Sequence, residues 1–421
     1  MTPSDVVQGV LQSAYGRLVG ALARRTGDLA AAEDALSEAF AAALRRWAVD
    51  GVPDRPEAWL LVAARRAHGH AARHGRVREA AVAALRQLEE ERAESEGAWH
   101  DPRLGLMFAC AHPAVDAGAR APLMLQAVLA LDAGRIAAAF LVSPAAMGQR
   151  LVRAKARLRE AGVRFEVPAE AEWPERLSPV LDAIYAAHAG GWGDAASVAE
   201  GTDARSPGLT AEAIWLARLL AALLPGEAEA QGLLALLLHC AARRAARRGP
   251  GGEYVPLDVQ DPRDWDAGLI VEAEAALRGA ARIARARPGL GSVGRYQLEA
   301  AIQSAHAARR SGAGADPEAV ALLYEGLVMV APGLGALVGR AAAIGAARGA
   351  AAGLAALDGL AVEEPARCAG YQPYWAVRAH LLAEAGAGGA AEAYDRAIGL
   401  SEDPAVREFL LGRRAGLGGA A

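Results

Sequence analysis

Four long polar side chains recur on one side of a predicted helix. Read at about 100° per residue, the segment 144–160 places Gln149, Arg150, Arg153 and Arg157 on one stripe. Three guanidinium groups and an amide in this pattern can hold phosphates and pair with base edges of duplex DNA. A cationic stripe is also common on an ordinary solvated helix face, and these residues alone leave that alternative open.

The opposite stripe of the segment is apolar, and both ends carry residues that delimit helices. Ser143 stands at the N-cap and Pro144 at the first helical position, whereas Gly162 follows the last predicted turn. We therefore expect a helix that buries one face and exposes the other. The apolar stripe consists of Met147, Leu151, Ala154 and Leu158.

The buried face needs a partner, and the preceding segment supplies one. Residues 135–140 are predicted to form a short helix, and the connection Leu141-Val142-Ser143 is too short for the two helices to lie antiparallel. This spacing predicts a helix-turn-helix whose second helix enters a DNA major groove. A plain helical hairpin is the competing interpretation.

Other groups that could support chemistry lack the context they need. His68, His70 and His74 form an HxHxxxH cluster, but a third ligand is not evident on the face that two of them share. The GxGxxG pattern at 289–294 follows an arginine-rich helical segment and a proline instead of a strand. We therefore expect a protein that is not an enzyme and that holds no metal and no cofactor.

Composition and charge narrow the fold class and the partners. Aromatic residues make up 5% of the 421 residues and alternating β-branched runs are nearly absent, so we expect an all-α fold. Residues 1–165 carry a net charge of +4 and residues 166–421 one of −8, which indicates different partners for the two parts. Three distant cysteines, no membrane-length apolar run and no signal-like N-terminus favour a cytoplasmic protein.

Three further amphipathic helices are predicted before the helix-turn-helix. They cover residues 5–25, 28–47 and 57–74, and the charged residues 79–98 are typical of a linker. This order of parts resembles the extracytoplasmic-function RNA polymerase sigma factors, which retain sigma regions 2 and 4.

Three stretches carry the resemblance within these regions. Residues 33–40, EDALSEAF, are similar to the "AED-x-x-QE-x-F" stretch of region 2, and residues 59–65, WLLVAAR, to its "WL-x-x-VAR" helix. Residues 151–159, LVRAKARLR, are similar to the end of region 4. The resemblance implies a region 2 bundle at 1–76, a linker at 77–100 and a region 4 helix-turn-helix at 101–165.

The resemblance also implies roles for individual residues. The family's "AED" helix docks on the polymerase, and its Trp-bearing helix opens the −10 element, where exposed aromatic and basic groups would stack on bases and contact phosphates. The residues expected to bind polymerase are Glu33, Asp34, Glu38 and Phe40. The residues expected to bind DNA are Ser143, Ala146, Gln149, Arg150, Arg153, Lys155, Arg157, Trp59, Arg65, Arg66 and Arg73. Trp47 is a second aromatic candidate, and core packing of both tryptophans is the alternative.

Residues 166–421 resemble the helical extension of a subgroup of these factors, which carries TPR-like repeats. Similar stretches occur at 165–168, 176–185, 212–220 and 296–307. Small and large residues follow the TPR spacing at Tyr374, Val377, Leu381, Ala390, Tyr394 and Ala397, and Pro404 closes that unit. Stacked repeats would form a groove for a peptide or protein segment, whereas a solid helical cap is the alternative.

We therefore expect a sigma factor that binds core RNA polymerase and promoter DNA, without a membrane. The acidic extension would regulate or support it, for example by covering the basic DNA-binding surfaces until a signal frees them. The alternative is a TPR-type interaction scaffold with a degenerate DNA-binding front domain, because residues 145–148 offer few groups that read base edges. A steep loss of DNA affinity with rising salt would distinguish the sigma factor from the scaffold.

Overall fold

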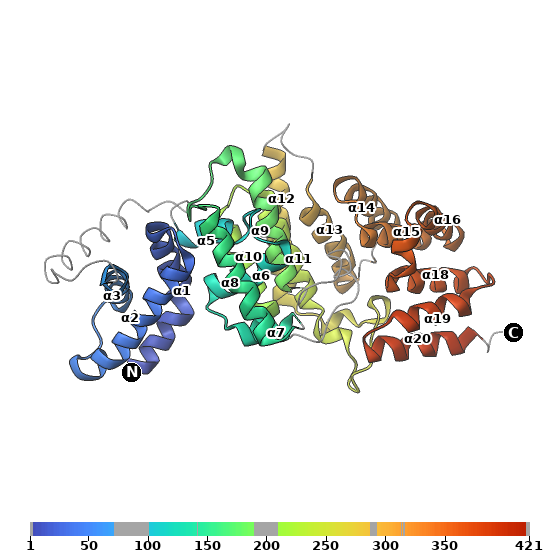
Figure 1. Ribbon diagram of the computed structural model, residues 1–421. Helices are drawn as coiled ribbons and strands as arrows, with labels where there is room; N and C mark the ends of the chain where they lie inside the picture. The colour runs from blue at the N-terminus through green and yellow to red at the C-terminus, as the bar shows by residue number, and fades with distance from the viewer. Residues whose placement is uncertain are drawn as a thin grey trace. The chain divides into compact units, whose positions relative to one another are not determined.

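A computed structural model describes residues 3–70, 101–140, 142–188, 209–286, 293–312, 314 and 316–417. In these ranges the regular elements are helices, apart from one isolated bridge between Arg248 and Tyr254 (Figure 1). The predicted all-α fold is confirmed. The chain divides into two compact units, the first with helices α1 to α10 and the second with α11 to α20.

The first unit begins with a three-helix bundle and continues with a second group of helices. It contains α1 (Pro3–Thr26), α2 (Leu29–Asp50), α3 (Pro56–His70), α5 (Pro102–Cys110), α6 (Ala117–Leu129), α7 (Ala133–Ala139), α8 (Pro144–Glu160), α9 (Trp173–His188) and α10 (Leu209–Leu223). α2 packs on α1 and α3, and α1 also packs on α5 and α6. The bundle and the second group are therefore in direct contact.

Local signals account for the ends of the helices that matter here. The Asp28 carboxylate accepts hydrogen bonds from the backbone N–H groups of Ala30 and Ala31, which begins α2. Gly51, with φ of +83°, follows the end of α2. These two signals place α2 within a few residues of the predicted segment 28–47.

The fusion of later helices to the first unit was not predicted. α9 packs on α5 and α6, and α10 packs on α9, although both helices follow residue 165. Glu212 on α10 forms an ion pair with Arg135 on α7. Contacts across the expected boundary therefore tie the start of the extension to the predicted region 4.

The second unit is a succession of packed helix pairs. It contains α11 (Ala228–Ala242), α12 (Ala267–Ala286), α13 (Arg295–Ala307), α14 (Pro317–Val330), α15 (Leu334–Arg348), α16 (Ala350–Glu363), α17 (Pro365–Ala369), α18 (Gln372–Glu384), α19 (Ala390–Leu400) and α20 (Pro404–Gly416). Short 3-10 helices of this unit lie at Ala245–Arg247, Leu257–Val259, Pro262–Asp264 and Ala308–Ser311, and one in the first unit lies at Glu170–Glu172. Neighbouring helices pack along the chain, α14 on α15, α15 on α16, α18 on α19 and α19 on α20.

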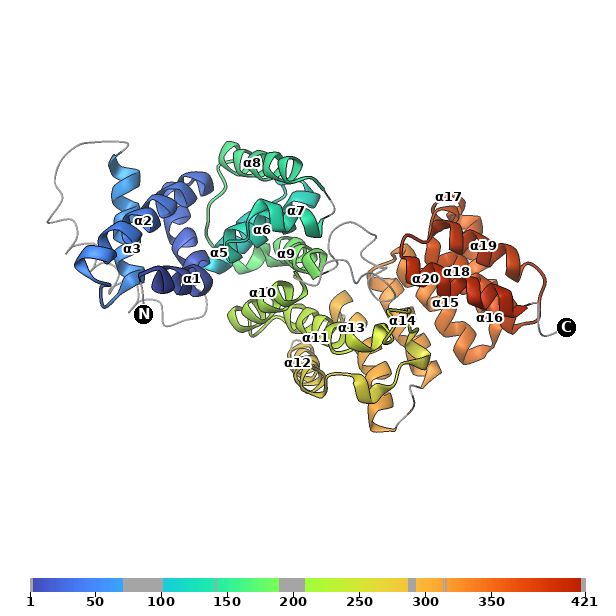
Figure 2. The same cartoon turned by 90° about the horizontal axis from the view of Figure 1, so that it is seen from below.

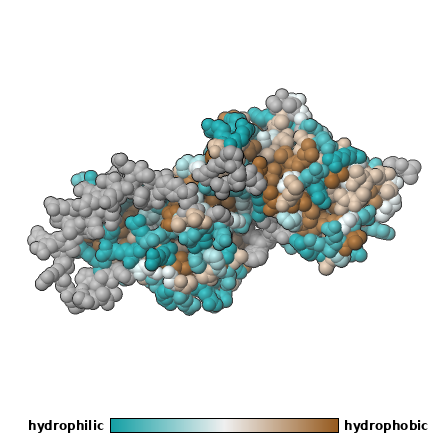
Figure 3. Space-filling model, turned by 90° about the horizontal axis from the view of Figure 1, so that it is seen from above, coloured by the Kyte–Doolittle hydropathy of each residue, from teal (hydrophilic) through white to brown (hydrophobic). Residues whose placement is uncertain are grey.

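The positions predicted to follow TPR spacing lie on α18 and α19. Tyr374 and Leu381 belong to the core that α18 shares with α15 and α16, and Tyr394 and Ala397 to the core that α19 shares with α18 and α20. Tyr374, Leu381, Ala390, Tyr394 and Ala397 are buried, and Val377 is half-buried. Elsewhere in the second unit α14 exposes apolar side chains, with Leu322 56% and Met329 83% accessible. Hydrophobic surface is visible on this unit in Figure 3.

Candidate nucleic-acid interface

Helix α8 has the predicted boundaries and the predicted division into two faces. It runs from Pro144 to Glu160, and the Ser143 hydroxyl accepts a hydrogen bond from the Ala146 N–H at 3.2 Å. α8 packs on α6 and α7 within the first unit (Figure 2). The four residues of the apolar stripe, Met147, Leu151, Ala154 and Leu158, are all buried.

The cationic stripe faces away from this core. Gln149, Arg153 and Arg157 are exposed, and Arg150 is half-buried. Arg157 has an ion pair within its own helix, 3.6 Å from Glu160, and the Nε of Arg153 donates to the Gln149 carbonyl at 3.4 Å. Such exposed contacts contribute little free energy, so phosphates can replace them.

The connection between α7 and α8 is short and hydrogen-bonded. The N–H of Val142 donates to the Ala137 carbonyl at 3.1 Å, and Ser143 begins α8. Ser143 and Ala146 are both exposed at this end of the helix. The arrangement presents the N-terminal turn of α8 together with its arginine stripe, which is the geometry that groove binding requires.

Lys155 lies apart from the arginines. Its Nζ donates a hydrogen bond to Oε2 of Glu33 on α2, and both side chains are largely buried. Burial raises the pKa of the Glu33 carboxyl, and the Lys155 ammonium opposes that rise. One residue expected to bind DNA and one expected to bind polymerase therefore contact each other.

The other residues expected to bind polymerase occupy different environments on α2. Asp34 and Glu38 are exposed, so both carboxylates are available to a partner. Phe40 is buried in the bundle, where it can position α2 by packing.

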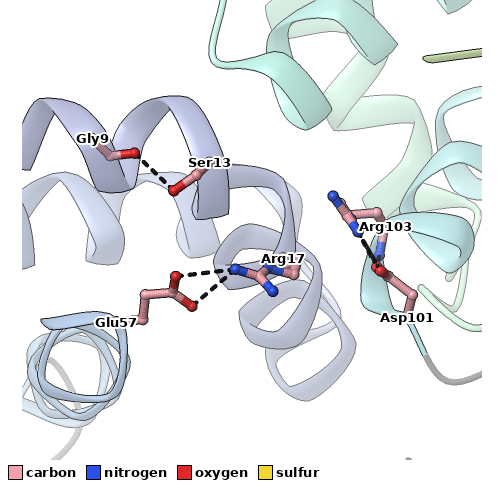
Figure 4. Close-up of polar contacts among 6 residues, drawn as sticks. All are labelled: Gly9, Ser13, Arg17, Glu57, Asp101 and Arg103. Carbon is pink, nitrogen blue, oxygen red and sulfur yellow. Dashed lines mark hydrogen bonds and ion pairs between the residues drawn. The ribbon is translucent and has the colours of Figure 1, made fainter. Parts of the chain in front are cut away.

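Helix α3 carries Trp59 and two arginines that are expected to bind DNA. Trp59 is half-buried and packs edge-to-face against buried Trp47, with ring centroids 5.4 Å apart. Arg65 and Arg66 are half-buried on the same helix, and Arg73 lies outside the described residues. A salt bridge of 3.0 Å between Arg17 on α1 and Glu57 holds the start of α3 (Figure 4).

Binding a metal ion and crossing a membrane each require particular groupings of side chains. Within those residues no group of three or more His, Cys, Asp and Glu side chains is placed to hold an ion. The side chains of His68 and His70, and all of His74, lie outside the described part of the chain. None of the described helices is both long and apolar enough to cross a membrane.

Sequence reasoning missed the ion pairs that connect distant segments, among them Lys155 with Glu33 and Arg135 with Glu212. The partners are 122 and 77 residues apart, so no local pattern connects them. One signal was available for the first pair, because Lys155 is the single lysine of the chain.

Two parts of the chain match known protein families, and the whole chain matches a known protein. Residues 11–78 match the family described as Sigma-70 region 2, and residues 176–281 match a family of unknown function, DUF6596. The chain is 36% identical to an uncharacterized protein of Rhizobium meliloti (strain 1021), in an alignment that covers 97% of this chain and 95% of that protein. No solved structure matches the chain.

Proposed function

Because residues 11–78 match Sigma-70 region 2, we propose that the chain is a sigma-70 family factor that binds core RNA polymerase and directs it to a defined set of promoters, in the manner of an extracytoplasmic-function factor. Helix α8 would read the −35 element, and the bundle of α1 to α3 would recognise and open the −10 element. Such a factor acts with the polymerase in the cytoplasm and carries out no catalysis itself.

The arginine face of α8 is the observation that carries this proposal. Arg153 and Arg157 are exposed, while the apolar stripe behind them is buried. A helix anchored in this way can enter a major groove without losing its core contacts. Gln149 is the side chain best placed by type to read an adenine, and the arginines suit phosphates or a guanine.

The bundle offers separate surfaces for polymerase and for DNA. Asp34 and Glu38 on α2 would contact the polymerase, and Glu33 would join them when Lys155 releases it. Trp59, Arg65 and Arg66 on α3 would contact the −10 element. Because Trp59 already packs against Trp47, stacking on a base would use its remaining exposed face.

The second unit would serve as a protein-binding extension with TPR-like repeats. The consecutive pairing of α14 to α20 and the buried positions at α18 and α19 support this assignment. The exposed apolar side chains of α14 offer a surface for a protein or peptide segment. The extension would thereby regulate or support promoter recognition.

Salt dependence of DNA binding tests the proposal. With full-length protein and a duplex from a promoter that it transcribes, the affinity should fall steeply as salt rises. We expect Arg153→Ala and Arg157→Ala each to make the slope of log K against log salt shallower by about 1. Val152→Ala, on the neighbouring exposed position, is the matched control and should leave the slope unchanged. A slope that none of the arginine variants alters would contradict the assignment of α8.

A further inference from the structure

A buried ion pair joins the two groups of helices in the first unit. Lys155 on α8 is the chain's single lysine, against 44 arginines, and it pairs with Glu33 on α2 with side-chain exposures of 14% and 13%. Removing one partner from such a pair leaves the other charge buried and uncompensated. The pair therefore ties α8 to α2 whenever the two groups of helices are in contact.

Helices α1, α2, α5 and α8 converge on this pair. Burial, together with the Glu33 carboxylate, raises the pKa of Tyr15 on α1 and of Cys110 on α5, and Lys155 opposes the effect at Cys110. The Oε1 atom of Glu33 is buried and has no hydrogen-bond partner among the described residues. The pair thus sits at a desolvated junction.

A close helix contact lies beside this junction. A Cβ added at Gly16 on α1 would lie 2.5 Å from the carbonyl oxygen of Val128 on α6, and one at Gly20 would lie 2.7 Å from that of Pro102 on α5. Because both obstacles are backbone atoms, they cannot move aside as a flexible side chain could. Only glycine fits at these two positions while the helices are in contact.

We propose that the Lys155–Glu33 pair and the Gly16–Gly20 contact form a latch that holds the first unit in a resting state unable to engage a promoter. This inference rests on the proposed function. The −35 and −10 elements lie about 25 base pairs apart by their names, roughly 85 Å along B-form DNA. The contact of α1 with α5 and α6 keeps the two groups of helices together, whereas binding both elements at once requires the groups to lie far apart.

The latch also occupies side chains that the bound state needs. Glu33 is one of the residues expected to bind polymerase, and Lys155 is one of those expected to bind DNA. While they neutralise each other, neither is available to its external partner. Separation of α2 from α8 therefore frees both sites in one step.

The single lysine makes the latch directly measurable. An amine-acetylating reagent applied to the full-length protein has two targets, the N-terminal amine and Lys155 Nζ, and peptide mass spectrometry separates them. In the wild-type protein Lys155 should react far more slowly than free Nα-acetyl-lysine amide. Gly16→Ala combined with Gly20→Ala should raise its rate on the order of tenfold, because the added Cβ atoms disfavour the closed contact. Gly9→Ala is the matched control, since it lies on the same helix with open space around it.

Affinity for core RNA polymerase then shows whether the latch restrains function. The double glycine variant should bind core polymerase on the order of tenfold more tightly than Gly9→Ala, because a larger fraction is open. Circular dichroism should show the same helix content in both proteins, and Gly20→Ala alone provides a milder variant if the double variant unfolds. Unchanged Lys155 reactivity, or raised reactivity with unchanged polymerase affinity, would overturn the latch. Absence of polymerase binding in every variant would instead refute the proposed function. The Lys155 reactivities are measured without polymerase, so they would still show in that case whether the helix contact opens.

Discussion

Trp173 on α9 stacks on Phe108 of α5, with ring centroids 6.5 Å apart and ring planes inclined by 30°. Both side chains are buried, and the Trp173 indole N–H donates to the Pro168 carbonyl at 3.0 Å. The first helix after the predicted region 4 is therefore part of the core of the first unit.

Replacing Trp173 should destabilise the first unit strongly. We expect Trp173→Ala to lower the free energy of unfolding by about 3–5 kcal/mol, because a large buried ring is removed. Trp215→Ala on α10 should cost much less, since Trp215 is exposed, with Arg103 over its ring. Urea denaturation of the two variants, followed by circular dichroism, measures the difference. Equal losses would show that the contact with Phe108 is not part of the core in solution.

The contact between Trp173 and Phe108 limits where a deletion of the extension can begin. A deletion that begins at residue 170 would strip α9 from Phe108, whereas a deletion of residues 225–421 retains every helix of the first unit. If the acidic extension shields the DNA-binding surfaces, the protein without residues 225–421 should bind promoter DNA more tightly than the full chain. Electrophoretic mobility shifts at matched salt test this expectation. Unchanged or weaker binding would assign the extension a supporting role.

The apolar stripe of α8 should contribute more to stability than its exposed surface. Leu151→Ala is expected to cost about 2–5 kcal/mol, because Leu151 is buried and the cavity would collapse only in part. Val152→Ala, one residue on and 68% exposed, should change stability by no more than about 0.5 kcal/mol. Chemical denaturation of both variants checks the contrast, and a comparable effect at the two positions would contradict the orientation of α8.

The second unit should lose stability in mild acid. Burial, reinforced by Arg243 and Arg309, lowers the pKa of His306 from 6.5 to about 4. The unfolded chain therefore binds a proton between pH 6.5 and 4 that the folded chain does not, so stability is complete above pH 6.5 and falls as the pH drops toward 4. The loss should approach about 3 kcal/mol. In His306→Gln the slope of stability against pH across this window should flatten, and an unchanged slope would exclude His306 as its source.

The sequence predicted those features that depend on neighbouring residues. Ser143, Pro144 and Gly162 delimit α8 by local capping chemistry, and the apolar stripe followed from helical periodicity alone. The exposed arginine face of the candidate site followed from the same periodicity.

Features that depend on distant contacts were not predictable in this way. No property of the residues near Glu33 indicates that Lys155, 122 positions later, will donate a hydrogen bond to its carboxylate. Burial of Phe40 and the packing of Trp47 on Trp59 likewise depend on how three helices assemble. The inclusion of α9 in the first unit depends on long-range contacts such as that of Trp173 with Phe108.

Run-off transcription tests the central claim most directly. Core RNA polymerase should be combined with the full-length protein and fragmented genomic DNA of the source organism, and the 5′ ends of the transcripts mapped. We predict discrete start sites that require the protein and that disappear when Arg150, Arg153 and Arg157 are all replaced with Ala, while Val152→Ala retains them. Transcripts that are the same with and without the protein would contradict the account.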